Sequence, residues 1–311
     1  MADLKYTAKE RDMSCDNCPR LCNCKREDGK LGFCQMPADI YISKHMLHPF
    51  EEPCVSGKMG AGTIFFTGCN LKCVFCQNKE ISRQNNGKHV TADELLDIIY
   101  SLSNMGAECI ELVTPTHYTS ELIPIIKEAR RKVNLPFVWN SGGYDGVDSI
   151  RKLDGLIDVY MPDLKYFSDE LAIKYSNASN YFSVAIGGIE EMLRQVGKPK
   201  FDSNGKLISG VIVRHLVLPA CREDSVNLLL ELSKRISPDD IILSLMSQYT
   251  PEFYDIEMGG HKNLLRRVTS FEYSKVLDAA IKFGFDGYFQ GRSSASSRYT
   301  PSFDDESKSF N

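Results

Sequence analysis

Residues 62–82 read GTIFFTGCNLKCVFCQNKEIS, and this stretch decides the fold. Its apolar start, residues 63–67, predicts a buried strand. Gly68 then opens a loop that carries Cys69, Cys73 and Cys76, separated by three and then two residues. In parallel βα folds, functional sites gather at the carboxyl ends of the strands. The loop is therefore the first candidate site.

Beyond this stretch, short apolar runs alternate with longer amphipathic ones, which is typical of repeated βα units. We expect strands at residues 63–67, 109–113, 137–139, 157–161, 210–218 and 241–245, and helices at 91–102, 120–132, 147–153, a stretch ending near 195, and 224–235. Thr91 and Glu94 have the spacing of a capping box, and Asn204-Gly205 predicts a turn in a polar hairpin or loop insertion. About six βα repeats predict an α/β fold, an incomplete parallel (β/α)6 barrel resembling a TIM barrel.

The composition excludes several classes of protein. Lys and Arg number 37 against 41 Asp and Glu, so a net charge of -4 argues against a nucleic-acid partner. No apolar run is long enough for a membrane span, and the charged N-terminus lacks a signal-peptide pattern, so we expect a cytoplasmic protein. No P-loop, Rossmann glycine fingerprint, HExxH or catalytic-serine elbow occurs. The usual NTPase, dehydrogenase and hydrolase functions are therefore disfavoured.

The eleven cysteines indicate metal chemistry, because nine of them lie within residues 15–76 and clustered thiols in a reducing compartment commonly bind metal. Cys69, Cys73 and Cys76 supply three of the four ligands of a 4Fe–4S cluster, which leaves one iron open. S-adenosylmethionine (SAM) fits that vacancy, and one electron can then cleave it to a 5′-deoxyadenosyl radical. The alternatives are a zinc site completed by a distant residue, or thiols that are merely buried.

The CxxxCxxC loop resembles the signature of the radical SAM superfamily. Further stretches, LVTPTHYT at 112–119, WNSGGYD at 139–145 and MPDLKYF at 161–167, are similar to proteins related to the pyruvate formate-lyase activating enzyme. The resemblance covers roughly residues 15–250. It is nearest to homologues that share the cysteine-rich N-terminal segment and whose substrates are mostly unassigned.

The resemblance also implies where SAM binds. The family's Gly-Gly-Glu is absent after the second strand, an acidic residue before Asn140 is replaced by Trp139, and Gln248 stands in place of a family histidine. The candidate SAM-binding residues are Phe75, Thr114, Thr116, His117, Asn140, Ser141, Arg214 and Gln248.

Several of these residues have a purely structural alternative. Arg214 could pair with Asp163 or Glu111, Gln248 could cap a strand end, and a lone histidine such as His117 is more often structural than catalytic. For Asp163 and Lys165, an internal salt bridge is the favoured interpretation.

The N-terminal cysteines predict a second metal site. Four thiolates can close a zinc site or a second iron–sulfur cluster, with Cys24 and Cys54 as spare ligands. The favoured role is to hold together a segment that has little core of its own, and the alternative role is an electron relay. A relay requires that the site lies near Cys69. The four expected ligands are Cys15, Cys18, Cys22 and Cys34.

We therefore expect a metal-binding segment at residues 1–60, a barrel at 61–285 and a partly flexible tail at 286–311 with an exposed loop at 292–298. The expected enzyme is a radical SAM oxidoreductase that takes electrons from flavodoxin or ferredoxin. Its radical would abstract hydrogen from a glycine of a partner polypeptide. The alternatives are a different peptide or small molecule, or a non-catalytic metal-binding scaffold or nucleic-acid module. Unchanged iron content in Cys69→Ala, without SAM cleavage, would favour the scaffold.

Overall fold

The computed structural model describes residues 15–290. Its strands form a sheet with the order β10-β9-β8-β6-β5-β4-β2-β1-β3. From β10 to β2 all neighbouring strands are parallel. The expected loop at residues 292–298, and the tail beyond residue 290, lie outside the described residues. The parallel strands are β2 (Ala61–Phe66), β4 (Ile110–Val113), β5 (Phe137–Ser141), β6 (Val159–Pro162), β8 (Leu207–Leu216), β9 (Ile242–Met246) and β10 (Gly287–Phe289).

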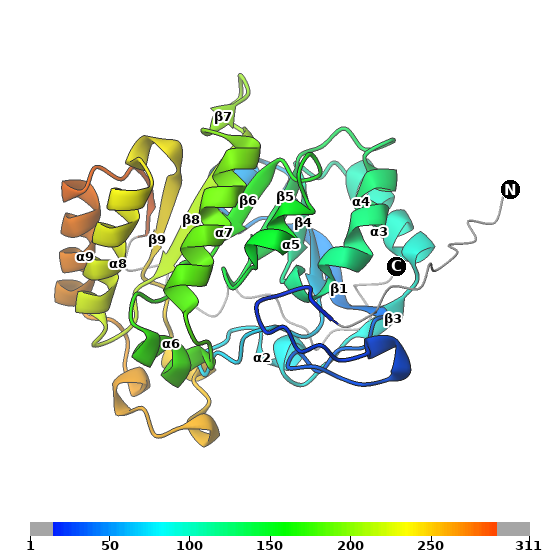
Figure 1. The fold of residues 1–311 in the computed structure, drawn as a ribbon. Helices are drawn as coiled ribbons and strands as arrows, with labels where there is room; N and C mark the ends of the chain where they lie inside the picture. Colours follow the sequence, from blue (N-terminus) through cyan, green and yellow to red (C-terminus); the bar gives the residue numbers. More distant parts are fainter. Residues whose placement is uncertain (1–14, 291–311) are drawn as a thin grey trace, which may run out of the picture.

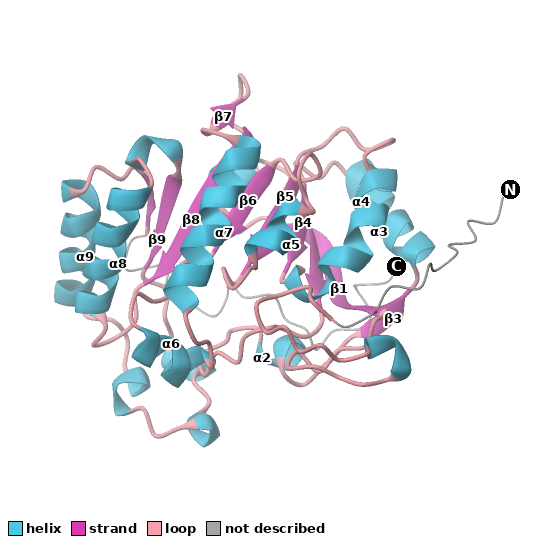
Figure 2. Cartoon of the chain, viewed as in Figure 1, coloured by secondary structure: helices cyan, strands magenta, loops and turns pink. Residues whose placement is uncertain are grey.

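Helices follow the strands along the chain (Figures 1 and 2). They are α1 (Pro53–Ser56), α2 (Lys79–Ser82), α3 (Ala92–Asn104), α4 (Thr119–Ala129), α5 (Val147–Arg151), α6 (Asp169–Ser176), α7 (Tyr181–Val196), α8 (Arg222–Arg235) and α9 (Ser270–Lys282). Short 3-10 helices occupy Arg26–Asp28, Thr116–Tyr118, Pro238–Asp240, Pro251–Phe253, Ile256–Met258 and Lys262–Leu265. Within the described part of the chain, no helix is long and apolar enough to cross a bilayer.

The expected alternation of parallel strands and helices is confirmed, and with it the incomplete parallel barrel. Among the described residues, β10 adds a seventh parallel strand to the six expected, from the start of the stretch expected to be a tail. Each expected strand and helix of the barrel has a counterpart within a few residues of its predicted bounds. The polar hairpin is also present. In it, β7 (Lys200–Phe201) pairs antiparallel with β8, and Asp202 accepts backbone hydrogen bonds from Asn204 and Lys206.

Two antiparallel strands extend the sheet beyond β2 and were not expected from the sequence. They are β1 (Ile40–His48) and β3 (Lys88–Val90), and β1 pairs with β2 from Ile42 opposite Phe66 to His48 opposite Ala61. The residues 43–45, Ser-Lys-His, interrupt the apolar alternation of β1, so its sequence lacks a clear strand period. As a result, part of the segment 1–60 is built into the sheet, and it carries Glu51 and Glu52 toward the barrel interior.

The core packs large side chains between the sheet and its helices. Trp139 of β5, Phe66 of β2 and Phe137 are fully buried. Tyr181 of helix α7 is also buried. The hydroxyl of Tyr181 lies between the carbonyl oxygens of Gly142 and Asp163, 2.9 Å from each. The apolar core therefore fixes the loops that leave β5 and β6.

In the described part of the chain, two helices begin with complete capping boxes. The glutamates of these boxes differ in burial and so provide a matched test. Glu94 at the start of α3 is exposed, whereas Glu272 at the start of α9 is buried and also accepts hydrogen bonds from Arg266 and from the backbone of Ala220.

We predict that Glu272→Gln lowers the free energy of unfolding by about 2 kcal/mol at pH 7, because charge-assisted hydrogen bonds to a buried carboxylate are lost. Hydrogen bonds from Arg266 hold the pKa of Glu272 well below its usual range, although burial opposes this. The stabilisation is therefore present above the carboxyl's ordinary pKa and is lost as the pH falls below it. Urea titrations at pH 7 and in acid measure the effect. Glu94→Gln is the control, and an equal loss in both variants would contradict the prediction.

Candidate functional site

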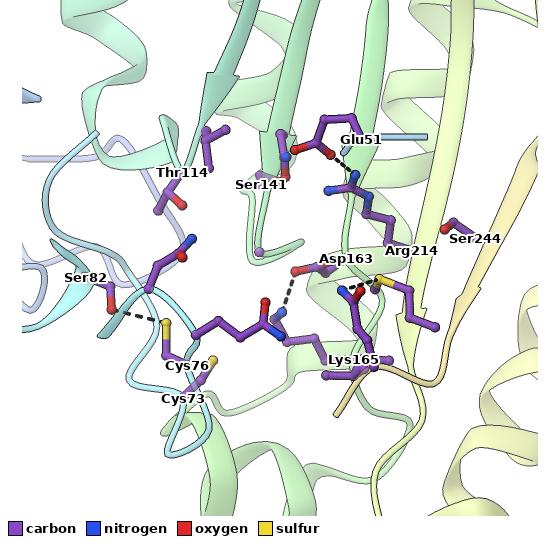
Figure 3. A pocket seen from close by; sticks show the side chains of 18 of the residues that line it. Glu51, Cys73, Cys76, Ser82, Thr114, Ser141, Asp163, Lys165, Arg214 and Ser244 are labelled. Atoms are coloured by element: carbon purple, nitrogen blue, oxygen red, sulfur yellow. Dashed lines mark hydrogen bonds and ion pairs between the residues drawn. The ribbon is translucent and has the colours of Figure 1, made fainter. Parts of the chain in front are cut away.

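A cavity of about 470 Å³ opens at the carboxyl ends of the parallel strands. Figure 3 shows Cys73 and Cys76 on one wall, with Glu51 and Arg214 on another. Most of the residues singled out from the sequence line this cavity, although they come from loops and strands far apart in the chain. They are Cys69, Cys73, Phe75, Cys76, Thr114, Asn140, Ser141, Arg214 and Gln248.

Each of the three cysteines in the loop after β2 has a hydrogen-bond partner at its sulfur. The backbone N–H of Leu71 donates to Cys69 Sγ at 3.3 Å, and the Ser176 hydroxyl donates to Cys73 Sγ at 3.0 Å. Cys76 Sγ lies 3.3 Å from the Ser82 hydroxyl. Hydrogen bonds to sulfur hold thiolates and tune the potential of iron–sulfur centres. The donor set and its surroundings therefore fit a cluster with three thiolate ligands.

The electrostatics of these thiols make metal binding dependent on pH. Burial, together with the charge of the neighbouring Cys73, raises the pKa of Cys69 to about 12. Burial also raises the pKa of Cys73. A metal must therefore displace protons when it binds. Within residues 15–290, no three His, Cys, Asp or Glu side chains are spaced as ligands of a single metal ion. The fit to a cluster rests on the chemistry of the donors.

Thr114 and Asn140 stand at the ends of adjacent strands. The backbone N–H of Thr114 donates to the Asn140 carbonyl at 2.8 Å, and Thr114 has a φ of 58°. A β-branched residue rarely adopts this left-handed conformation, which glycine prefers. Thr114 thus takes a glycine-like backbone at the place where the Gly-Gly-Glu of the activating enzymes is absent.

Asn140 is held in place from behind. Its Nδ2 donates to Glu111 at 2.7 Å, and Glu111 also accepts a 2.7 Å hydrogen bond from Thr63. Burial, with a further contribution from the charge of Glu51, raises the pKa of Glu111 to about 8. Its side chain is fully buried, so Glu111 fixes the amide of Asn140 without facing the cavity itself.

Thr116 and His117 do not line the cavity, although the family resemblance places them among the candidate SAM-binding residues. The Thr116 hydroxyl donates to Asp145 at 2.7 Å, and His117 Nε2 lies 2.7 Å from the Thr67 carbonyl oxygen. Burial lowers the pKa of His117 to about 3, so the ring is neutral. Both side chains are buried in the protein. The interpretation of His117 as a structural histidine therefore fits the structure better than a role in SAM binding.

Arg214 has different partners from those expected. It forms hydrogen bonds and ion pairs with Glu51 and Glu52, at 2.8 Å for Nε to Glu52, rather than with Asp163 or Glu111. Asp163 instead pairs with Lys165, as the sequence suggested. Gln248 accepts a 3.2 Å hydrogen bond from Gln290 beside β10. Arg214 and Gln248 therefore line the cavity, but some of their hydrogen-bonding groups are already paired with other protein residues.

The sequence interpretation missed several residues that shape the cavity. Glu51 and Glu52 follow the end of β1 after two intervening residues, and Ser82 and Ser176 support the thiols. The only local signal for the acidic pair is two consecutive glutamates before Pro53. Serines at such distances from the loop carry no sequence signal, because the fold alone brings Ser176 to Cys73.

The loop GGYDG at residues 142–146 depends on glycine. Gly143 has a φ of +76°, and a Cβ there would overlap the carbonyl oxygen of Asp163. The carbonyl oxygen of Tyr144 then accepts a 2.6 Å hydrogen bond from Asn70, which follows Cys69. The close packing thus links the end of β5 to the cysteine loop.

The N-terminal cysteines lie outside this cavity and gather in a loop of their own. A Cβ at Gly32 would stand 2.9 Å from Cys22 Sγ and 3.1 Å from Cys24 Sγ, and the backbone N–H of Cys15 donates to the Cys24 carbonyl. Cys18 and Cys34 are buried, whereas Cys15, Cys22 and Cys24 are partly exposed. Cys54, the other spare ligand, lies in α1 and is buried in a separate apolar cluster.

The geometry agrees with the comparisons with known proteins. The family model that describes the radical SAM superfamily matches residues 63–204. An uncharacterized protein of Methanocaldococcus jannaschii is 30% identical over 302 residues, covering 92% of this chain and 80% of that protein. The chain belongs to the radical SAM superfamily. Its cofactors are a 4Fe–4S cluster and SAM.

Other similarities are partial. A protein of Haemophilus influenzae, provisionally named a glycyl-radical enzyme activating enzyme, is 28% identical over 134 residues. This match covers 41% of the chain and about half, 49%, of that protein. Among solved structures, methylornithine synthase has a TM-score of 0.47 at 16% identity, covering 68% of this chain and 59% of that one. SuiB of Streptococcus suis bound to its precursor peptide has a TM-score of 0.47 at 12% identity, covering 72% and 46%.

Proposed function

We propose that Cys69, Cys73 and Cys76 bind the 4Fe–4S cluster and leave one iron for SAM. When bound, these cofactors supply reductive cleavage of SAM to a 5′-deoxyadenosyl radical. The observation that carries the proposal is that the three thiols open onto one cavity together with polar groups from the ends of β4 and β5. A cluster held there faces a space that is lined by protein on several sides.

The remaining lining residues divide the cavity by chemistry. Asn140 and Ser141 offer hydrogen bonds to the polar groups of SAM, and Thr114 adds a hydroxyl and a backbone turned by its positive φ. Phe75 packs edge-on against Tyr249, with ring centres 6.1 Å apart, and provides an apolar surface for the adenine. Arg214 and Gln248 remain candidate contacts on the opposite wall.

We further propose that the hydrogen is abstracted from a glycine of a partner polypeptide in the cytoplasm, with flavodoxin or ferredoxin as the reductant. Two observations support this substrate class. One is the resemblance of the loops after β4, β5 and β6 to activating enzymes, and the other is the name of the Haemophilus influenzae relative.

The test is anaerobic. The reconstituted and reduced protein is mixed with SAM and a glycyl-radical protein encoded beside it, and electron paramagnetic resonance is recorded. We expect a glycyl radical signal with 5′-deoxyadenosine formed in proportion, and neither with Cys76→Ala. Abundant 5′-deoxyadenosine without a glycyl signal would contradict glycine as the substrate and favour another peptide or a small molecule. No SAM cleavage at all would contradict the proposed reaction.

A further inference from the structure

The N-terminal cysteine segment packs directly on the loop that carries Cys69. A Cβ at Gly68 would overlap the side chain of Met36 and stand 3.3 Å from the carbonyl oxygen of Cys34. Gly68 precedes Cys69, so the backbone of one expected N-terminal ligand contacts the backbone beside a ligand of the proposed cluster. Met36 is buried.

Arg20 makes a second connection between the two sets of thiols. Its Nε donates a 2.9 Å hydrogen bond to the carbonyl oxygen of Asn70, the residue after Cys69. The guanidinium stacks over Phe33, 3.7 Å from the ring centre, and interacts electrostatically with Cys18, Cys22 and Cys69. One buried nitrogen, Nη2, has no hydrogen-bond partner among the described residues. A cation with a free N–H thus stands between the two sulfur-rich loops.

The segment is also attached firmly to the barrel. Arg26 is buried and donates to the His117 carbonyl oxygen at 2.7 Å and to the Met36 carbonyl oxygen at 3.1 Å. Asn17 donates to the same His117 oxygen at 3.1 Å. These contacts fix the position of the N-terminal thiols relative to Cys69, which electron transfer between two centres requires.

We propose that the N-terminal thiols bind a second iron–sulfur cluster and that this centre passes electrons to the cluster at Cys69. The inference rests on the proposed function. One electron comes from reduced flavodoxin or ferredoxin, which is oxidised, and it reduces the cluster at Cys69, so the N-terminal centre ends in the oxidation state in which it began. Zinc would staple the segment equally well, but it has no redox chemistry.

The arrangement of the thiols favours the relay. Cys15, Cys22 and Cys24 are partly exposed, so a protein reductant can approach them, whereas Cys34 is buried and its carbonyl oxygen lies against Gly68. A metal site that only stabilises the N-terminal segment would place no requirement on where this segment packs on the barrel. Here the partly buried hydrogen bond of Arg20 and the buried side chain of Met36 fall on residues 68–70, within the loop that holds the proposed cluster.

The first arm of the test measures metal content. Iron, zinc and sulfide per chain are determined for the anaerobically reconstituted full-length protein, for Cys18→Ala/Cys34→Ala and for Cys221→Ala, a buried cysteine outside both sets. We expect iron and sulfide for two clusters in the wild type, for one in the double variant, and wild-type content in Cys221→Ala. Zinc in the wild-type protein, or iron unchanged in the double variant, would overturn the proposal.

The second arm measures electron transfer and keeps the proposal testable where the double variant does not fold. Arg20→Gln retains every thiol, and we expect full iron content but roughly tenfold slower reduction of the cluster at Cys69 by flavodoxin. Rapid-freeze electron paramagnetic resonance follows the reduction, and dithionite serves as the small reductant that bypasses the relay. Equal rates with flavodoxin would overturn the relay. A wild-type protein that reduces both clusters but does not cleave SAM would contradict only the proposed function.

Discussion

Replacing Arg214 with methionine should lower the free energy of unfolding by about 3–5 kcal/mol, because it leaves two buried carboxylates without their cation. Glu51 and Glu52 are only 10% and 6% exposed at their side chains, and Arg214 is 14% exposed. Burial opposes ionisation of Glu52, but the charge and hydrogen bonds of Arg214 keep the pKa of this carboxyl below its usual range. Chemical denaturation at neutral pH measures the loss.

Arg131→Met provides the matched control for this prediction. Arg131 pairs with Glu128 on the surface and is 74% exposed, so its loss should cost less than about 1 kcal/mol. A variant Glu51→Gln/Glu52→Gln/Arg214→Met removes the uncompensated charges together with the cation, and it should recover part of the stability. If Arg214→Met unfolds at the same denaturant concentration as Arg131→Met, this triad does not stabilise the fold.

Cys73→Ala should abolish SAM cleavage and remove most of the iron bound at the cavity, because two thiolates do not hold a 4Fe–4S cluster. Cys73 is the cysteine whose sulfur accepts the hydrogen bond from Ser176, so its environment is built from α6 as well as from its own loop. Iron content, the absorbance of the cluster and the yield of 5′-deoxyadenosine measure the effect.

Cys109→Ala is the control for Cys73→Ala. Cys109 is buried and lies just before β4, outside the cavity lining. This variant should keep both iron and SAM cleavage, even where it unfolds more easily. Retention of SAM cleavage by Cys73→Ala would contradict the assignment of this residue as a ligand.

The repeating part of the fold could be predicted from the sequence because its signals are local. The capping box at Thr91, the turn at Asn204-Gly205 and the apolar runs of β2, β4 and β8 each lie within a few residues. Strand β1 could not be predicted in this way. Its stability comes from pairing with β2, and its sequence carries polar residues in the middle.

The sequence could predict those parts of the site whose position follows from the order of the parallel strands. Loops that leave the carboxyl ends of parallel strands must meet at one edge, which brings Cys69, Thr114 and Asn140 together. The direction of each side chain within a loop could not be predicted in this way. The positive φ of Thr114, followed by the 3-10 helix Thr116–Tyr118, turns Thr116 and His117 away from the cavity. The contacts of Arg214 also depend on β1, and no local pattern reveals them.

The most direct test of the central claim is electron–nuclear double resonance on the reduced Cys18→Ala/Cys34→Ala variant, in which the cluster at the cavity is the one expected to remain. SAM is supplied with an isotope-labelled amino nitrogen. We predict a hyperfine coupling between that nitrogen and the cluster, because SAM chelates the iron that Cys69, Cys73 and Cys76 leave open. A cluster signal that SAM leaves unchanged, without any coupling to the label, would contradict the proposed site.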